Sequence, residues 1–166
     1  MTDLTNKSTA TVYSPPEWKP PTNAKPFLSV IATAERANGI PEGLLVRLLY
    51  QESAYRPEVI SGVVKSPVGA VGIAQVMPAT AADPGFGAPV LRDSTDPYEA
   101  IPWSAKYLAG LYRYLGDWAQ ALAAYNWGAG YVRKTVDRYG DRWREYLPLE
   151  TSNYVAQITR DVGGVA

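Results

Sequence analysis

Apolar side chains recur every three or four residues along most of the chain, which is the spacing of one face of an α-helix. Residues 27–38 and 42–53 carry this pattern. Gly39 directly follows the first segment, as is typical of a helix end, and Pro41 precedes the second, as is typical of a helix start. The N-terminal part of the domain therefore begins as two consecutive helices.

The same reading predicts a mostly helical chain beyond residue 53. Asp96-Pro97 is typical of an N-cap followed by proline at the first helical position, so a long helix is expected from there to about residue 115. Further helices are expected at 118–126, 130–139 and 150–162, a short helical piece broken at Pro78 is expected at 72–82, and loops are expected at 54–71 and 83–95. The predicted fold class is all-α, a single globular domain with at most a small hairpin within 58–71.

The N-terminal segment differs in composition from the rest. Residues 1–26 contain five of the fourteen prolines and no helical periodicity, which predicts a Pro-rich extended or disordered arm before a globular domain at 27–166. Because the segment has no apolar core of a secretory signal and the chain has no apolar run of membrane-spanning length, we expect a protein made in the cytoplasm without a signal peptide and without membrane insertion.

Composition restricts the possible chemistry. The chain has no cysteine and no histidine, which excludes disulfides, thiol nucleophiles, Ser-His-Asp triads and the usual zinc sites. Lys+Arg and Asp+Glu both number 16, a balance that argues against nucleic-acid binding. The 12 Tyr and 5 Trp against 2 Phe suit the binding of sugar rings, although ordinary helix packing explains them equally well.

Glu52 is the first candidate catalytic residue. On a helix it shares the apolar face with the leucines seven, four and three residues before it, Leu45, Leu48 and Leu49. Desolvation on such a face raises the pKa of a carboxyl group, and a carboxyl that stays protonated near neutral pH can act as a general acid. The alternative is a structural Glu that extends into solvent or pairs with Arg47 or Arg56.

Two further segments carry candidate binding residues. In GAVGIAQVMPATA, residues 69–81, Gln75 is a polar residue among apolar neighbours and needs hydrogen-bond partners. In ALAAYNWGAG, residues 121–130, Tyr125 and Asn126 end an Ala-rich helix and either face a cleft or take part in capping it.

The ordered combination of QES, GAVGIAQVMPATA, AAYNWGAG and LPLETSNYV resembles the soluble lytic transglycosylase family, over roughly residues 28–160. The resemblance implies a lysozyme-like domain with a central catalytic helix and a cleft. It implies that Glu52 is the sole catalytic acid and base. It also implies a set of substrate-binding residues: Ser53, Gln75, Met77, Tyr125, Asn126, Glu150 and Tyr154.

The resemblance further implies the reaction. The substrate is peptidoglycan, and the β-1,4 bond from N-acetylmuramic acid to N-acetylglucosamine is cleaved with formation of a 1,6-anhydro product, without metal or cofactor. Three residues depart from the family pattern: Ala74 stands where methionine is usual, Trp127 where a small residue is common, and Ala129 where proline is frequent. We interpret Trp127 as a packing residue, with a sugar-stacking role as the alternative.

Two rival functions stay open at this point. A goose-type hydrolase on the same scaffold needs a second carboxylate to activate water, for which Asp83, Asp93 and Asp96 are candidates. A non-catalytic wall-binding module is the other rival. For the biological setting, the compact chain resembles a bacteriophage endolysin, which would reach the bacterial wall from the cytoplasm through holes made by a holin-type partner. A virion-associated enzyme and a domain excised from a longer chain are the alternatives. A monomer is expected, because the sequence shows no dedicated association helix.

Overall fold

A computed structural model describes residues 16–165. In chain order the helices are η1 (Thr22–Phe27, 3-10), α1 (Leu28–Asn38), α2 (Leu44–Ser53), α3 (Pro57–Ile60), α4 (Pro78–Ala82), α5 (Pro97–Leu115), α6 (Trp118–Trp127), α7 (Ala129–Tyr139), η2 (Gly140–Tyr146, 3-10) and α8 (Leu149–Asp161). The described residues contain no strand, so the all-α prediction is confirmed.

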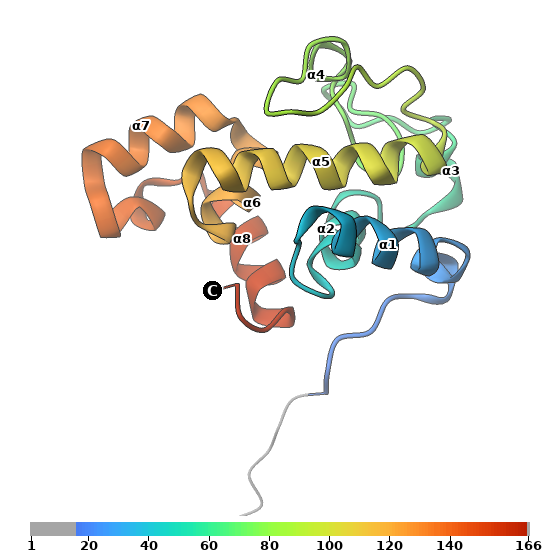
Figure 1. The fold of residues 1–166 in the computed structure, drawn as a ribbon, viewed down its shortest axis with the longest axis horizontal. Helices are drawn as coiled ribbons and strands as arrows, with labels where there is room; N and C mark the ends of the chain where they lie inside the picture. Colours follow the sequence, from blue (N-terminus) through green and yellow to red (C-terminus); the bar gives the residue numbers. More distant parts are fainter. Residues whose placement is uncertain (1–15, 166) are drawn as a thin grey trace, which may run out of the picture.

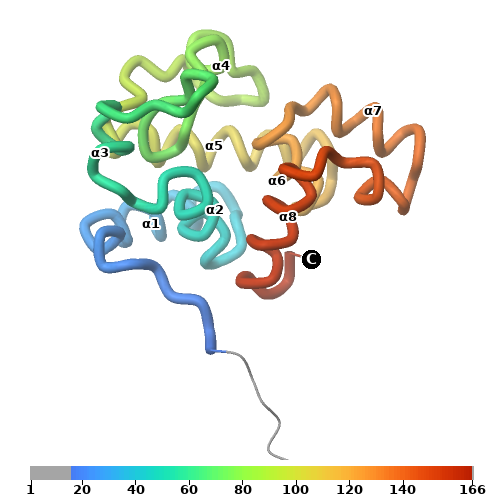
Figure 2. The backbone as a smooth tube through the Cα atoms, turned by 180° about the vertical axis from the view of Figure 1, so that it is seen from behind, coloured from blue at the N-terminus to red at the C-terminus, as the bar shows by residue number. Residues whose placement is uncertain are grey.

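The long helix α5 runs through the middle of the molecule (Figure 1). Helix α1 packs against it on one side and α6 at its C-terminal end, while α8 contacts both α6 and α2. The loops around α4 lie over the opposite side of α5, and the view from behind shows residues 16–21, in blue, extending from η1 (Figure 2). Within residues 16–165 no helix is long and apolar enough to cross a bilayer.

Helix α5 begins and ends where the sequence predicts. The Asp96 carboxylate accepts a hydrogen bond from the Tyr98 amide at 2.9 Å, Pro97 occupies the first turn, and the helix ends at Gly116 with φ 81°. In its middle, Gly110 lies against the backbone of Phe86, where a side chain would collide. The predicted loop 83–95 is therefore seated directly on α5.

Helix α2 is fixed by the burial of its leucines and by a cap that α1 supplies. Its leucines Leu44, Leu45, Leu48 and Leu49 are fully buried, each contributing about 2 kcal/mol through removal from water. The helix has no side-chain cap of its own. Instead, the carboxylate of Glu35 on α1 accepts hydrogen bonds from the Gly43 and Leu45 amides at 3.2 and 2.9 Å. Helix α1 thus caps α2 and fixes the direction in which its C-terminal end points.

The structure refines the expectations for two adjoining segments, 58–71 and 72–82. The prediction allowed at most a small hairpin within 58–71, and none forms there: the segment holds most of the short helix α3, and one antiparallel bridge joins Val71 at its end to Val76. The helical piece expected at 72–82 begins only at Pro78, because 72–77 forms a turn.

The predicted N-terminal arm also needs revision at its C-terminal end. Residues 22–26 belong to η1, with Ala24 buried, so the globular part begins before residue 27. Residues 16–21 have no helix, and Trp18 among them packs on Tyr50 of α2 with 5.5 Å between ring centroids. The first fifteen residues of the predicted arm lie outside the described part of the chain.

Candidate active site

Glu52 lies in the last turn of α2, half-buried, and meets a residue from the far end of the chain. The hydroxyl of Tyr154, on α8, donates a hydrogen bond to Glu52 Oε1 at 2.6 Å. The Tyr154 side chain is itself buried. The two helices therefore join at the carboxyl group that the sequence singles out.

The surroundings keep the Glu52 carboxyl protonated at neutral pH. Burial raises its pKa to about 8, and the negative charge of Glu150 acts in the same direction. The hydrogen bond from Tyr154 opposes these effects because it stabilises the ionised form, but it is the smaller influence. Burial and the neighbouring Glu52 charge in turn raise the pKa of Tyr154 well above its usual value, so this hydroxyl stays a donor.

The structural alternative for Glu52, an ion pair with a nearby arginine, is not what the structure contains. Arg47 Nε pairs with Asp161 Oδ2 at 2.8 Å, and Arg56 pairs with Glu58 at 2.6 Å. No cation neutralises Glu52 among the described ion pairs.

Glu52 lines two surface hollows, and a third shares lining residues with each of them; together we call the three the cleft. The aromatic hollow, about 190 Å³, is lined by Gln75, Val76, Met77, Thr80, Trp103, Tyr107, Ala124, Tyr125, Asn126, Trp127 and Gly128. The basic hollow, about 300 Å³, is lined by Gln51, Glu52, Ser53, Ala54, Arg56, Val59, Val64, Lys65, Ser66 and Gln75. The amide hollow, about 280 Å³, is lined by Gln51, Glu52, Asn126, Glu150, Asn153, Tyr154 and Gln157.

Gln75 and Asn126 connect the hollows. Glu52 is common to the basic and amide hollows, Gln75 to the aromatic and basic hollows, and Asn126 to the aromatic and amide hollows. A chain-like ligand can therefore lie across all three while passing the carboxyl group. The structure brings together Glu52 and all seven predicted binding residues as lining residues of this cleft.

The loop that carries Gln75 is held by hydrogen bonds of its own. Gln75 adopts a positive φ of 49°, and its side-chain amide donates to the Gly72 carbonyl at 2.9 Å. The hydroxyl of Tyr125 on α6 donates to the Ala74 carbonyl at 3.0 Å. Burial raises the pKa of Tyr125 well above its usual value, so the hydroxyl keeps this donor role. Tyr125 thus fixes the loop against α6, a task that the sequence alone did not reveal.

Asn126 is oriented by a residue that sequence reasoning missed. Thr151, buried on α8, donates a hydrogen bond from its hydroxyl to Asn126 Oδ1 at 2.8 Å. This hydrogen bond orients the side-chain amide, whose nitrogen can then donate to a ligand. Thr151 belongs to the LPLETSNYV segment quoted above, so its place in that motif could have identified it as a site residue.

The remaining predicted residues take different positions in the cleft. Ser53 is buried, and its hydroxyl donates to the Leu49 carbonyl at 3.0 Å and accepts from the Tyr55 amide at 3.3 Å, which ties the end of α2 to the following loop. Met77 is 38% exposed on the wall of the aromatic hollow. Glu150 is exposed at the amide hollow.

Sequence reasoning also missed the aromatic wall contributed by α5. Trp103 and Tyr107 lie one helical turn apart, stack with 4.9 Å between centroids and line the aromatic hollow. The Trp103 indole donates to the Pro89 carbonyl at 2.7 Å, which anchors it. Their spacing of four residues on a predicted helix was the available signal.

The three aspartates considered for water activation do not line the cleft hollows. Asp93 accepts from the Thr95 amide at 2.9 Å, Asp96 caps α5, and Asp83 is exposed at the end of α4. Among the described residues no group of three or more acidic, His or Cys side chains is placed to hold a metal ion.

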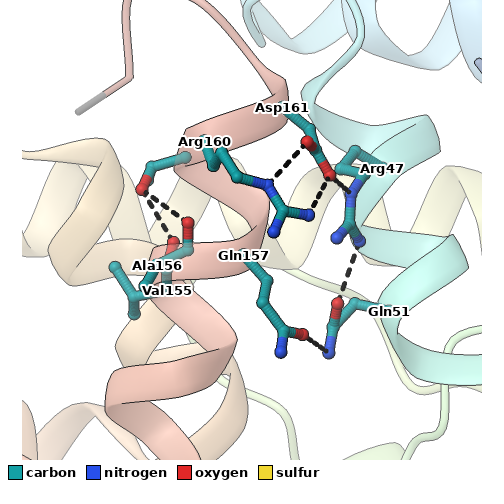
Figure 3. A network of polar contacts seen from close by, with 8 residues as sticks. Arg47, Gln51, Val155, Ala156, Gln157, Arg160 and Asp161 are labelled. Carbon is teal, nitrogen blue, oxygen red and sulfur yellow. Dashed lines mark hydrogen bonds and ion pairs between the residues drawn. The ribbon is translucent and has the colours of Figure 1, made fainter. Parts of the chain in front are cut away.

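A polar network holds α2 against α8 (Figure 3). Arg47, almost fully buried, donates to Asp161 Oδ2 and, at 2.9 Å, to Gln51 Oε1. The side-chain amide of Gln51 in turn donates to Gln157 Oε1 on α8 at 2.9 Å. The guanidinium group also lies over the ring of Trp18, 5.4 Å from its centroid. The network connects the segment before η1 to two side chains, Gln51 and Gln157, that line the amide hollow.

Comparison with known proteins places this arrangement in a family. Residues 29–147 match the model of the transglycosylase SLT domain. The chain is 34% identical over 133 residues to the soluble lytic murein transglycosylase of Escherichia coli, covering 72% of this chain and 20% of that protein. It is 29% identical over 145 residues to the membrane-bound lytic murein transglycosylase D of the same organism, covering 81% of this chain and 30% of that protein.

Two solved structures of lytic transglycosylases have a similar fold. An inactive Glu-to-Gln mutant of the lytic transglycosylase Slt from Pseudomonas aeruginosa superposes with a TM-score of 0.65 at 28% identity, covering 80% of this chain and 23% of that one. The 70 kDa soluble lytic transglycosylase of Escherichia coli gives 0.62 at 30% identity, covering 78% and 22%. This chain spans between 20% and 30% of the length of the two curated relatives. By its sequence match and its lysozyme-like all-α fold, the chain belongs to the transglycosylase SLT domain family.

Proposed function

We propose that this protein is a lytic transglycosylase that cleaves the β-1,4 bond between N-acetylmuramic acid and N-acetylglucosamine in peptidoglycan and leaves a 1,6-anhydro-N-acetylmuramic end. One observation carries the proposal: the Glu52 carboxyl, with a pKa raised to about 8, lines both the basic and the amide hollow of the cleft. A protonated carboxyl in an extended cleft is suited to protonate the oxygen between two sugars.

In the first step the Glu52 proton moves to the glycosidic oxygen. The bond between that oxygen and C1 of N-acetylmuramic acid breaks, and its electron pair stays with the departing N-acetylglucosamine oxygen. The substrate's own N-acetyl oxygen holds the positive charge at C1. Oε1 of Glu52 accepts the Tyr154 hydrogen bond, and we assign the transferred proton to the other oxygen, Oε2.

In the second step the ionised Glu52 removes the proton of the C6 hydroxyl of the same N-acetylmuramic acid. O6 then bonds to C1, the N-acetyl oxygen is released from C1, and Glu52 is protonated again for the next cycle. Atoms and charge balance without water, so one carboxyl serves both steps, unlike the two-carboxylate glycosidases. Tyr154 supports this cycle because its hydrogen bond stabilises the carboxylate that exists between the two steps.

The other cleft residues then have roles in binding. The Gln75 and Asn126 amides, which join neighbouring hollows, are placed for hydrogen bonds to sugar hydroxyl and N-acetyl groups. Met77 supplies apolar wall, and Tyr125 keeps the Gln75 loop in position. Ser53 acts through the end of α2, because its hydroxyl is engaged with the backbone.

The hydrolytic alternative has less support. The two hollows that contain Glu52 are lined by one other carboxylate, Glu150. Asp83, Asp93 and Asp96 do not line them. The charge of Glu150 serves to raise the pKa of Glu52. The relatives support the transglycosylase reaction, since their names describe lytic murein transglycosylases, and the Pseudomonas protein was solved as a Glu-to-Gln mutant that is inactive.

The test is digestion of purified peptidoglycan followed by mass spectrometry of the released muropeptides. Wild type is expected to release products one water lighter than reducing-end muropeptides, and Glu52→Gln is expected to release none. Glu42→Gln, an exposed glutamate just before α2, is the matched control and should behave as wild type. Reducing ends that take up labelled solvent oxygen would identify a hydrolase, and equal release by wild type and Glu52→Gln would exclude Glu52 as the acid.

The biological setting stays a prediction: an endolysin-like enzyme that acts on the wall as a monomer and reaches it with a holin-type partner. Sedimentation of the purified protein tests the monomer. Lysis of cells that express the chain with and without a holin tests the route to the wall.

A further inference from the structure

An aromatic pair stands at the end of the aromatic hollow, on the short connection between α6 and α7. Trp127, the last residue of α6, stacks on Tyr131 with 5.0 Å between centroids and 17° between the ring planes. Trp127 is half-buried and lines the hollow, whereas Tyr131 is 59% exposed. One member of the pair thus belongs to the cleft wall and the other to the open surface beside it.

The backbone between them keeps the pair in place. Gly128 has φ 115° and ψ 138°, a conformation that residues with a side chain rarely adopt. This turn starts α7 directly after α6 and brings the Tyr131 ring back over Gly128, where an added Cβ would lie 3.4 Å from the ring. Gly128 itself lines the aromatic hollow, so the tyrosine ring lies at the rim of that hollow.

The chemistry of the hollow indicates what the pair would contact. None of the side chains that line the aromatic hollow carries a charge, whereas the basic hollow contains Arg56 and Lys65 and the amide hollow contains Glu150. An uncharged hollow walled by Trp103, Tyr107 and Trp127 suits the apolar face of a neutral pyranose ring better than the carboxylates of a stem peptide.

Other stacked pairs in the described chain show what simple packing looks like. Tyr112 and Trp118 stack at 4.0 Å, and Tyr139 and Tyr146 at 3.5 Å. Neither pair contributes a residue to the three hollows of the cleft. The pair at 127 and 131 differs because it combines a cleft-lining indole with an exposed ring on the rim.

We propose that Trp127 and Tyr131 form an aromatic platform that stacks a pyranose ring of the glycan strand, beyond the sugars bound next to Glu52. This inference rests on the proposed function and deepens it: it assigns the aromatic hollow to the neutral glycan and makes long strands better substrates than short ones. Trp127, which departs from the small residue common in the family pattern, then adds binding surface that such a residue does not provide.

The experiment compares kcat and KM on uncrosslinked peptidoglycan strands fractionated by length. The variants are Tyr131→Ala, which removes the exposed ring, and Trp127→Leu, which keeps an apolar side chain for packing but has no flat face. Tyr146→Ala is the matched control, because Tyr146 is also an exposed ring, 42% accessible, stacked on another tyrosine. Circular dichroism and the unfolding midpoint establish that each variant is folded.

For long strands we expect both platform variants to raise KM about fivefold to tenfold with kcat unchanged, as loss of a stacking contact implies. For the shortest strands that wild type cleaves, and for Tyr146→Ala at every length, kinetics should match wild type. The platform is excluded if wild type prefers no strand length, if both variants follow wild type at all lengths, or if they lose activity equally on short and long strands. If wild type cleaves no strand, the proposed function itself fails, and the platform with it.

Discussion

The hydroxyl of Tyr154 lies 2.6 Å from Glu52 Oε1 although the two residues are 102 positions apart in the chain. This contact joins α8 to the end of α2 and is directed at the carboxyl group whose pKa burial has raised to about 8. Burial favours the protonated acid, and the tyrosine favours the carboxylate. The pair therefore keeps the proton available for the first step while stabilising the charge that the first step creates.

Tyr154→Phe is expected to lower the rate of peptidoglycan cleavage roughly tenfold to a hundredfold, the loss associated with removing a hydrogen bond to a charged group. It should also raise the pKa of Glu52 further, because the influence that lowers it is gone. Muropeptide release at several pH values measures both effects. Tyr139→Phe, at a tyrosine that lines none of the three hollows, is the control. An unchanged rate and profile in Tyr154→Phe would mean that this hydrogen bond has no part in catalysis.

The activity of the wild type should fall as pH rises through about 8. Glu52 must carry its proton to act as the general acid, and its pKa in the folded protein is about 8. The base needed in the second step is formed by the first step, so no matching loss due to Glu52 is expected between pH 6 and 7. The measurement is kcat/KM from pH 6 to 10 in constant ionic strength. Activity that rises steadily to pH 10 would contradict a protonated Glu52 as the acid.

Stability should depend on pH through the same group. The folded-state pKa of Glu52 lies above its unfolded value, so its contribution is fully present below about pH 4.5 and is lost as pH rises through about 8. Glu52→Gln has no such loss. The free energy of unfolding of Glu52→Gln relative to that of wild type should therefore rise by on the order of a few kcal/mol from pH 5 to pH 9. Urea titrations at both pH values measure this, and a constant difference would show that Glu52 is ionised in the fold throughout.

Arg47→Met is expected to destabilise the domain by about 2 kcal/mol, because it removes the hydrogen bond that joins α2 to Asp161 on α8, while Asp161 keeps its pair with Arg160. It also releases Gln51, which lines two hollows of the cleft, so KM should rise as well. Urea unfolding and cleavage kinetics measure the two effects. Arg142→Met, which breaks the exposed pair with Glu145, should leave the unfolding midpoint unchanged. Equal midpoints for the two variants would show that the network in Figure 3 adds no stability.

Gly72→Ala is expected to destabilise the fold by about 3 kcal/mol and to reduce cleavage. Gly72 has φ 81°, and a Cβ there would collide with the backbone carbonyl of Ser94. The Gly72 carbonyl also accepts the Gln75 side-chain hydrogen bond, so the shift would disturb the cleft. Gly130→Ala is the control, because that helical glycine has open space around it and alanine should be neutral or slightly stabilising. Thermal unfolding and muropeptide release compare them, and wild-type behaviour of Gly72→Ala would show that the loop readily moves.

The helices were predictable because their signals are local. Asp96 followed by Pro97 identified the start of α5, and Gly39 marked the end of α1, since capping depends on a few adjacent residues. The segment 72–77 was misread as helical because its apolar residues serve a tight turn in which Gln75 has a positive φ. Composition and periodicity do not distinguish these two uses of the same side chains.

The sequence by itself determined that Glu52 lies on the apolar face of α2, because that follows from the spacing of the leucines, but it left open whether the carboxyl is desolvated or reaches solvent or an arginine. The tertiary structure alone decided which groups surround that carboxyl. Tyr154 donates to it, Arg47 turns away to Asp161, and Thr151 orients Asn126. These partners come from helices that meet only when the whole core is packed, so no short stretch of sequence encodes their geometry.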